Sequence, residues 1–280
     1  MSLALARIPE PARWERVQHC VNLLAAGTLD PGAIRVARRG GRLVGAQVCV
    51  PLSGKTCLFW IPTAPGPIAD QLVQAALDGC RRLGCKVAQA LASADEIDQA
   101  GPLLRCGFRI TTRMHQLGHD LLNLDEAPPS ALRFEPFREA NRPLFTATLE
   151  RTYDGTLDCP ELNGIRTMDE ILDGHRYQGK FDPDFWWLVF DGADAVGVVM
   201  LVELADGLTW ELAYLGVAAP FRRRQLGRAM MLHAMQALRS QPAARLTLAV
   251  DTRNEPARRL YQSLGFVEIE SNDVLLLFFR

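Results

Sequence analysis

A short basic segment has the residue types and spacing that could bind a phosphate-bearing ligand. It reads Arg222-Arg223-Arg224-Gln225-Leu226-Gly227-Arg228-Ala229. The first backbone N–H groups of a helix have no partner inside the helix, and the helix dipole favours negative charge beside them. Gly227 lets the backbone approach a ligand closely because it has no Cβ, and the small Ala229 keeps the next turn open. The expected ligand is a pyrophosphate.

The four arginines of this turn also suit a solvated basic surface, which is the plainer interpretation. Each positive side chain at a helix N-terminus opposes the dipole by roughly 0.3–1 kcal/mol. The accumulated repulsion favours a bound anion, although the turn alone does not decide between the two interpretations.

Hydrophobic patterning predicts the elements that hold this turn. Apolar residues in 212–217 predict a strand before it, and apolar residues at helical spacing in 230–238 predict a helix after it. Residues 246–250 alternate as a further strand. Asn254 stands where a second helix is capped, with Pro256 in its first turn and Gly265 at its end. The apolar run 274–279 predicts a buried final strand.

Two motifs therefore occur in order, Arg224-x-x-Gly227-x-Ala229 and Asn254-x-x-Ala257-x-x-Leu260-Tyr261-x-x-x-Gly265-Phe266. Together they resemble the GCN5-related N-acetyltransferases (GNAT), and the resemblance covers roughly residues 134–280. It implies an α/β fold with a central mixed sheet flanked by helices. Gln225 departs from the family, which usually has Gly at that position.

The resemblance further implies acetyl-CoA as cosubstrate, with its pyrophosphate on the basic turn. The backbone of the strand at 215–217 is expected to pair with the pantetheine arm as a neighbouring strand would. The expected cofactor-binding residues are Leu215, Gly216, Val217, Arg222, Arg224, Gln225, Leu226, Gly227, Arg228, Ala229, Asn254, Ala257 and Tyr261.

Acetyl transfer to an amine requires a neutral amine, and a lysine-like amine at pH 7 is short of that form by about 4.6 kcal/mol. Glu211, on the strand before the turn, is the candidate base, acting through water. Tyr214 is a secondary candidate for the base, and Tyr261 is the candidate acid for the leaving thiolate. Alternatively, Glu211 is a glutamate at the strand edge that pairs with an arginine, and Tyr261 is an aromatic packing residue.

The acceptor is expected to bind along residues 141–179, where carboxylates and aromatic side chains suit a cationic amine. A solvated loop is an equally good interpretation of that segment. His175 has no second histidine at a metal-binding spacing, so no metal is expected.

The chain also repeats itself in part. Residues 42–48 parallel 195–200, each after a glycine-containing turn, and 103–108 parallel 261–266. The first half lacks the Arg-x-x-Gly-x-Ala motif, and Pro65 and Pro67 remove backbone donors from the equivalent turn. We expect two tandem GNAT-like domains: 1–120 degenerate, 121–133 a linker, and 134–280 catalytic. This two-domain layout is similar to that of mycothiol synthases, but the similarity does not extend to a prediction that this chain uses their substrate.

Composition excludes some classes of function. The 280 residues carry a net charge of −1, so no general nucleic-acid surface is expected. No apolar run reaches the roughly 20 residues of a membrane span, and the first ten residues are too short and polar for a secretory signal. Seven scattered cysteines without a CxxC pair predict separate core thiols in a cytoplasmic protein.

The expected function is acetylation of a primary amine of a small molecule by direct attack on acetyl-CoA. A non-catalytic acyl-CoA-binding or regulatory module and a protein N-acetyltransferase are the alternatives. The sequence names neither the amine nor the oligomeric state.

Overall fold

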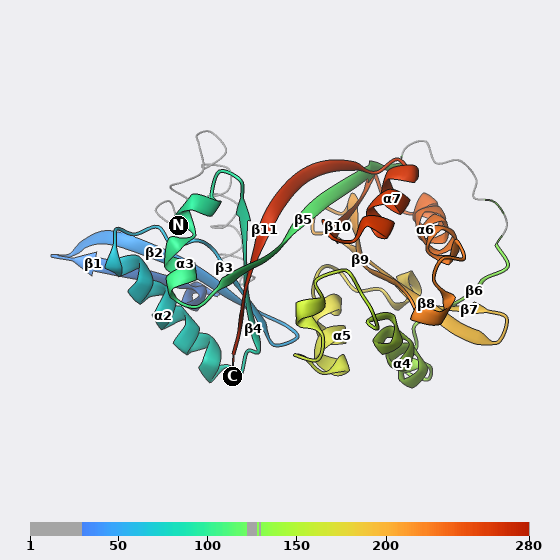
Figure 1. Cartoon of the computed structure of the whole chain (residues 1–280), viewed down its shortest axis with the longest axis horizontal. Helices are drawn as coiled ribbons and strands as arrows, with labels where there is room; N and C mark the ends of the chain where they lie inside the picture. The colour runs from blue at the N-terminus through green and yellow to red at the C-terminus, as the bar shows by residue number, and fades with distance from the viewer. Residues whose placement is uncertain (1–29, 122–127, 129, 280) are drawn as a thin grey trace. The chain divides into compact units, whose positions relative to one another are not determined.

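The computed structural model describes residues 30–121, 128 and 130–279 (Figure 1). Cys20 and the first ten residues, on which two of the expectations above depend, lie outside this range. The chain divides into two compact units, one of Met1–Thr111 with Asn272–Arg280 and one of Thr112–Ser271. The unit boundaries differ from the expected domains 1–120 and 134–280, because residues 112–120 belong to the second unit and residues 272–280 to the first.

The first unit is a mixed sheet with a helix between its parallel strands. Its strand order is β1-β2-β3-β4-β11, and only β3 and β4 are parallel neighbours. The bounds are β1 Ile34–Arg39, β2 Arg42–Leu52, β3 Thr56–Phe59, α2 Pro67–Arg82, β4 Val87–Ser93, α3 Gly101–Arg105 and β11 Val267–Phe278. Short 3-10 turns lie at Pro31–Ala33 and Ile97–Gln99.

Among the residues that the structure describes, the second unit repeats this plan and has one further strand and two further helices. Its strand order is β5-β10-β9-β8-β7-β6, and β9 and β10 are the parallel pair. The strands are β5 Arg109–Asp120, β6 Arg133–Pro136, β7 Trp186–Asp191, β8 Asp194–Glu203, β9 Thr209–Val217 and β10 Arg245–Asp251. The helices are α4 Arg142–Thr152, α5 Met168–Arg176, α6 Leu226–Ala237 and α7 Glu255–Ser263, with 3-10 turns at Pro160–Leu162, Pro183–Phe185, Ala219–Phe221 and Leu238–Ser240.

The long strand after the last short helix of each half explains the shifted boundaries. β5 follows α3 in the sequence, yet its residues 114–120 pair with β10 in the second unit. β11 follows α7, yet its residues 272–278 pair with β4 in the first unit. Each half of the chain therefore supplies a strand to the unit formed mainly by the other half. The predicted final strand is longer than expected, since it begins at Val267.

The glycine turns that suggested the internal repeat form equivalent hairpins. Gly40 and Gly41, between β1 and β2, both have positive φ, at 54° and 78°. Two such residues in succession give the turn whose twist matches a two-residue hairpin. Gly192, between β7 and β8, likewise has φ 61°.

Each repeat also has a glycine at a close approach in its central strand. A Cβ on Gly45 would lie 2.6 Å from the Cβ of Ala64, and one on Gly197 would overlap the carbonyl oxygen of Gly216. Strands β2 and β8 thus each pass a neighbouring segment at a distance that only glycine permits.

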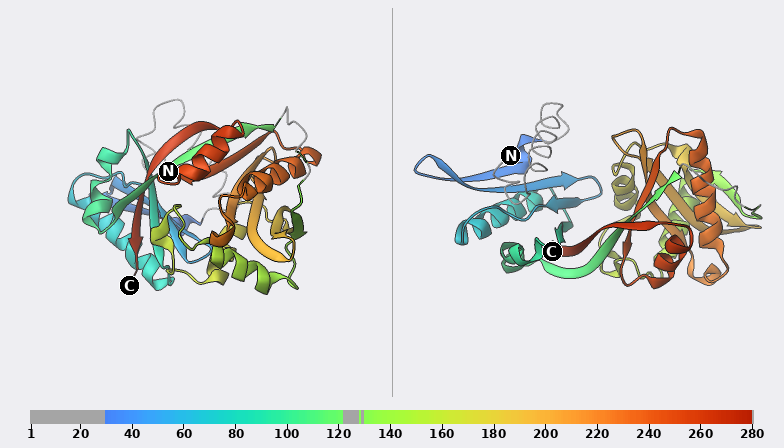
Figure 2. Two further views of the ribbon diagram at one scale, coloured as in Figure 1. Left: turned by 45° about the vertical axis from the view of Figure 1, so that its right-hand side comes forward. Right: turned by 90° about the horizontal axis from the view of Figure 1, so that it is seen from above.

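Apolar residues of the second unit form a core on each face of its sheet. Alternate residues of β8 divide between them: Val199 and Leu201 lie in the cluster with α6, and Val198 and Met200 in the cluster with α4 and α5. In Figures 1 and 2 these helix pairs, α6 with α7 and α4 with α5, cover opposite faces of the sheet. β9 lies beside β8 and is therefore held rigidly from both faces.

Candidate active site

Strand β9 carries an irregularity in the middle of its pairing with β8. Met200 faces Tyr214, whereas the next residue, Leu201, faces Leu212, so Ala213 is an extra residue on β9. A bulge of this kind bends a strand and redirects the side chains that follow. Because of the bulge, the side chains from Tyr214 to Val217 no longer follow the regular alternation between the two faces of the sheet that the residues before Ala213 follow.

On its other edge, β9 separates from β10. The parallel pairing covers only Thr209 to Glu211, which face Arg245 to Thr247. β9 continues to Val217 and β10 to Asp251, without further paired residues between them in the part of the chain that the structure describes. The edge of β9 at 212–217 therefore offers backbone groups to an extended ligand, where a splayed strand was expected.

The basic turn after β9 leads directly into α6. Gln225, the residue that departs from the family pattern, has φ 60° in the left-handed region. Glycine reaches that conformation without steric cost, but glutamine adopts it here, so the departure leaves the turn intact.

The N-terminus of α6 differs from that of α7. No side chain caps α6 and no acidic residue occurs in its first turn. On α7 the Oδ1 of Asn254 accepts a hydrogen bond from the N–H of Ala257 at 3.3 Å, and Glu255 lies in the first turn. The first N–H groups of α6 are therefore the ones left for an anionic ligand.

The arginines of the turn have different partners. Arg222 donates to the carbonyl oxygens of Val217, Thr152 and Gly155 at 3.0, 2.9 and 3.3 Å, which ties the turn to the end of α4. Arg224 pairs with Asp191 at 2.7 Å, and Arg228 donates to Ser263 Oγ at 2.9 Å. Arg222 therefore has a positioning role that the sequence did not indicate.

A cavity of about 550 Å³ lies beside α6. Three predicted cofactor-binding residues, Gln225, Arg228 and Ala229, lie on its wall. The remaining lining residues are Pro128, Ser130, Leu132, Phe134, Leu232, His233 and Gln236. The cavity gives the start of α6 a concave, partly apolar neighbourhood.

Glycines allow the closest approaches around this turn. A Cβ on Gly216 would lie 2.7 Å from the Cβ of Thr152 and from Cε1 of Tyr214, so a side chain there requires movement. A Cβ on Gly227 would reach Leu260 Cδ2 at 3.4 Å, an ordinary contact. Space inside the protein thus restricts Gly216 more than Gly227, although only Gly227 was singled out for close approach.

Tyr261 is buried on α7 at 7% exposure, within the core cluster that includes Phe266. Burial raises the pKa of its phenol, and the nearby charge of Asp158 raises it further. The hydroxyl is therefore protonated at neutral pH and able to donate a proton.

Glu211 is half-buried on β9 at the point where β9 and β10 separate. Burial raises the pKa of its carboxyl group above the ordinary value. Among the described residues no ion pair includes Glu211, which disfavours the interpretation of an edge glutamate paired with an arginine.

Asp158 is a solvent-exposed residue that the sequence analysis did not identify as a candidate catalytic group. Its Oδ1 accepts a hydrogen bond from the N–H of Asp251 at 3.1 Å, and Asn254 also hydrogen-bonds to it. Desolvation of its carboxyl group by the surrounding protein raises the pKa of Asp158 to about 6, although the residue as a whole is exposed, and its charge acts on both Tyr214 and Tyr261. No local pattern marks it, because the residues around it come from three separate segments.

Asp251, at the end of β10, is fully buried and holds the loop that carries Asp158. Its carboxylate accepts hydrogen bonds from Thr112 Oγ1 at 2.7 Å, from the N–H of Cys159 at 3.1 Å and from Arg253. Burial opposes the charge, but these hydrogen bonds outweigh it and lower the pKa of Asp251. Asp251 is thus a fixed anion with a positioning role.

Aromatic side chains from the expected acceptor segment surround Tyr214. The Tyr214 hydroxyl and Thr152 Oγ1 are 2.7 Å apart, and the rings of Tyr153 and His175 have centroids 5.6 and 5.7 Å from that of Tyr214. Burial lowers the pKa of His175 to about 4, so the ring is neutral at pH 7. The arrangement is polar and aromatic, and the positive charge of Arg166 acts on both Tyr153 and His175.

A model of the acetyltransferase (GNAT) family matches residues 149–266, which contain the divergent strand, the basic turn and α7. This segment is a GNAT acetyltransferase domain. The domain includes every residue predicted above to bind the cofactor.

Curated relatives match part of the chain. Mycothiol acetyltransferase of Beutenbergia cavernae is 38% identical over 178 residues, covering 58% of this chain and 58% of the relative. Mycothiol acetyltransferase of Corynebacterium diphtheriae is 37% identical over 145 residues, covering 44% of this chain and 47% of the relative. The chain thus spans about half the length of these relatives.

Solved structures show the same fold over more of the chain. A GCN5-related N-acetyltransferase from Sphaerobacter thermophilus has a TM-score of 0.57 at 17% identity, covering 85% of this chain and 78% of its own. A tandem GNAT protein from the clavulanic acid biosynthesis pathway has a TM-score of 0.54 at 15% identity, covering 92% and 87%. The mixed α/β fold expected from the sequence is confirmed.

Among the described residues, no helix is both long and apolar enough to cross a membrane.

Proposed function

We propose that the chain transfers an acetyl group from acetyl-CoA to a primary amine of a small molecule, and that residues 112–271 carry the reaction. The observation that carries this proposal is the separation of β9 from β10 next to the uncapped start of α6. These two features supply the donors and acceptors that an extended thioester with a pyrophosphate requires.

The residues fit the parts of the cosubstrate in order. Backbone groups of Leu215–Val217 would pair with the amides of the pantetheine arm, and the N–H groups at the start of α6 would hold the pyrophosphate. Arg228 and Gln225 border the adjoining cavity and would face the remaining polar groups. Arg222 would act by holding the turn, since its guanidinium is already bound to three carbonyl oxygens.

The acid and base would lie on opposite sides of the reacting thioester. Glu211 has a raised pKa and stands at the strand separation, where it would drain the amine proton through water. Tyr261, protonated and buried, would donate its proton to the thiolate as the thioester bond breaks. Asp158, which interacts with Tyr214 and Tyr261, would attract the cationic amine and is a second candidate base.

Within residues 30–111 and 272–279, the first unit lacks the features on which this proposal depends. Its parallel strands remain paired to the last residue of β3, where Phe59 faces Ala90. Its helix α2 begins with Pro67 and has Asp70 in its first turn, bound to Arg105 at 2.7 Å. A proline removes a donor and a carboxylate repels an anion, so we propose no coenzyme site there.

The relatives direct the choice of acceptors to test. Two of them are named mycothiol acetyltransferase, so an amine precursor related to mycothiol is the first candidate. Polyamines, aminoglycosides, amino acids and peptides complete the panel, with coenzyme A release measured by a thiol reagent. Turnover with one small amine supports the proposal; acetyl-CoA binding without turnover on any amine indicates a binding module, and turnover on peptides alone indicates a protein acetyltransferase.

A further inference from the structure

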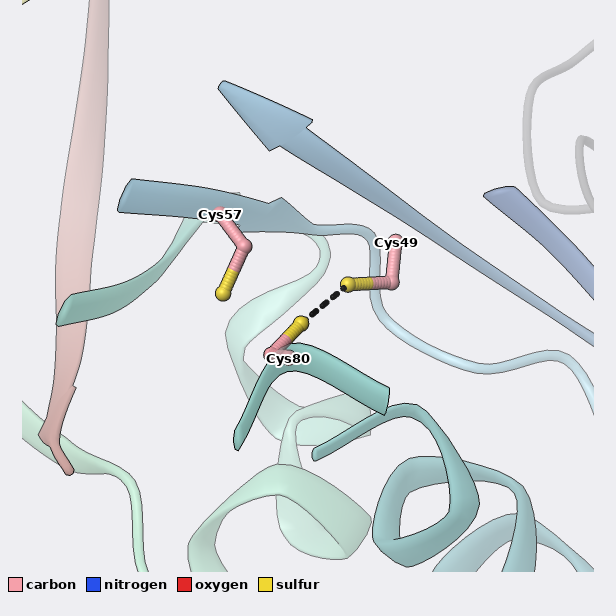
Figure 3. A group of neighbouring side chains, drawn as sticks. All are labelled: Cys49, Cys57 and Cys80. Carbon is pink, nitrogen blue, oxygen red and sulfur yellow. Dashed lines mark hydrogen bonds between the residues drawn. The ribbon is translucent and has the colours of Figure 1, made fainter. Parts of the chain in front are cut away.

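Three cysteines from separate elements of the first unit converge in its core (Figure 3). Cys49 lies on β2, Cys57 on β3 and Cys80 on α2, and their sulfur atoms all lie within 4.8 Å of one another. The sulfurs of Cys49 and Cys80 are 3.3 Å apart. The three residues are 0–2% exposed, so no solvent separates the thiols.

A fourth cysteine adjoins this cluster. The Cys85 thiol interacts with those of Cys57 and Cys80, and its sulfur lies 3.8 Å from the carbonyl oxygen of Thr56. The remaining cysteines that the structure describes, Cys106 and Cys159, lie elsewhere in the chain. Thiols that serve only as small apolar core side chains are not expected to cluster, because each would pack equally well against the aliphatic side chains nearby.

The spacing of the sulfurs suits a thiophilic metal ion. A Zn–S bond of about 2.3 Å in tetrahedral geometry separates neighbouring sulfurs by about 3.8 Å. The separations in the cluster range from 3.3 Å to at most 4.8 Å, so shifts of less than about 1 Å would bring the sulfurs to that distance.

The charge balance selects a divalent ion. Three thiolates and one divalent cation leave a single negative charge, and the positive charge of Arg35 acts on both Cys49 and Cys80. The Arg35 guanidinium lies against Gly79, next to Cys80 in α2. A monovalent ion would leave two negative charges in an apolar core, which a single arginine does not neutralise.

We propose that Cys49, Cys57 and Cys80 bind one thiophilic divalent cation, Zn²⁺ in the first instance, with Cys85 beside it as a potential fourth ligand. Binding by three thiols releases three protons and changes no oxidation state. The bound ion would join β2, β3 and α2, so it would be taken up as the unit folds and would stabilise it. This site is independent of the acetyl transfer proposed above.

The test measures zinc in the full chain produced under reducing conditions with added Zn²⁺. We expect one zinc ion per chain by native mass spectrometry and X-ray absorption with at least three sulfur ligands at about 2.3 Å. Cys57→Ser and Cys80→Ser should each lower zinc affinity at least about tenfold, since each removes a ligand. Cys106→Ser, which removes a thiol of the same unit outside the cluster, should keep the full amount.

Circular dichroism shows whether each variant is folded. The X-ray absorption measurement is made on the unaltered chain, so it tests the proposal even if a variant fails to fold. The proposal would be overturned if the unaltered chain held no zinc, or held zinc without sulfur ligands. It would also be overturned by a Cys49–Cys80 disulfide under these reducing conditions, or by an unchanged amount of zinc in folded Cys57→Ser and Cys80→Ser.

Discussion

Replacing Tyr261 by phenylalanine separates chemistry from packing at the proposed active site. The substitution keeps the ring, which packs against Phe266 at a centroid distance of 5.8 Å, and removes only the hydroxyl. The ring accounts for the buried apolar contact of this position, at 7% exposure in the core of the second unit. The variant should therefore fold as the unaltered chain does.

The expected magnitudes differ sharply between stability and turnover. No hydrogen bond to the Tyr261 hydroxyl is formed by the residues that the structure describes, so its loss should change the free energy of unfolding by less than about 1 kcal/mol. Loss of a general acid lowers turnover by about 10²–10⁴-fold, which corresponds to about 3–5 kcal/mol of transition-state stabilisation. We expect kcat to fall at least about tenfold even if another step limits part of the turnover.

The assay follows release of coenzyme A with the best amine of the panel, under conditions where chemistry limits the rate. KM for acetyl-CoA and the unfolding temperature are measured on the same preparation. Leu208→Ala is the control, because Leu208 lies in the same unit, is 54% exposed and belongs to no predicted site. It should leave kcat within about twofold of the unaltered value, as expected for a surface substitution.

Near-full turnover by Tyr261→Phe would show that Tyr261 only packs and that water or Tyr214 supplies the proton. A fall in turnover that is matched by a lower unfolding temperature would also refute the reasoning, since the structure assigns the hydroxyl no part in stability.

Three further predictions concern the cofactor site and the base. Gly227→Asp adds a carboxylate at the start of α6 and should weaken coenzyme A binding, measured by calorimetry, at least about tenfold. The control Gly207→Asp, at an exposed turn, should leave the affinity unchanged. Unchanged affinity of a folded Gly227→Asp chain would exclude the turn as the site. The same titration should give one coenzyme A site per chain, because β3 and β4 do not separate; two sites of similar affinity would contradict that. Glu211→Gln should move the pH–rate profile to higher pH, where the amine loses its proton unaided. In the unaltered chain the rate should rise as Glu211 ionises, at a pH above its ordinary pKa because burial raises it. Glu203→Gln should leave the profile in place, and an unshifted Glu211→Gln profile would assign the base elsewhere.

The local elements of the second half could be predicted because their signals lie within a few residues. The Asn254 cap and the Gly265 terminus define α7, and the hairpin glycines at 40–41 and 192 act through their own φ angles. The two motifs that bracket this region also sufficed to identify the family. In each case backbone preference and hydrophobic period determine the outcome without a distant partner.

The exchange of strands between the units could not be predicted in this way. β5 and β11 have ordinary strand patterns, and the pattern shows which residues form a strand but not which strand they pair with. The predicted boundaries at 120 and 134 therefore followed sequence order, whereas the units follow the pairing.

Tertiary structure also decided which polar and sulfur-bearing side chains meet. Arg222 has the same local sequence signal as its neighbours, yet the approach of α4 and the residues after it gives Arg222 two distant carbonyl partners, Thr152 and Gly155. Asp158 has a raised pKa because the fold brings it next to Asp251, 93 residues away, where its carboxyl group is desolvated. Likewise, Cys49, Cys57 and Cys80 meet only after β2, β3 and α2 have packed. The sequence by itself determined the local elements and the type of domain, because those depend on short-range preferences. The positions where charge and thiols gather depend on long-range packing, so they appeared only in the folded chain.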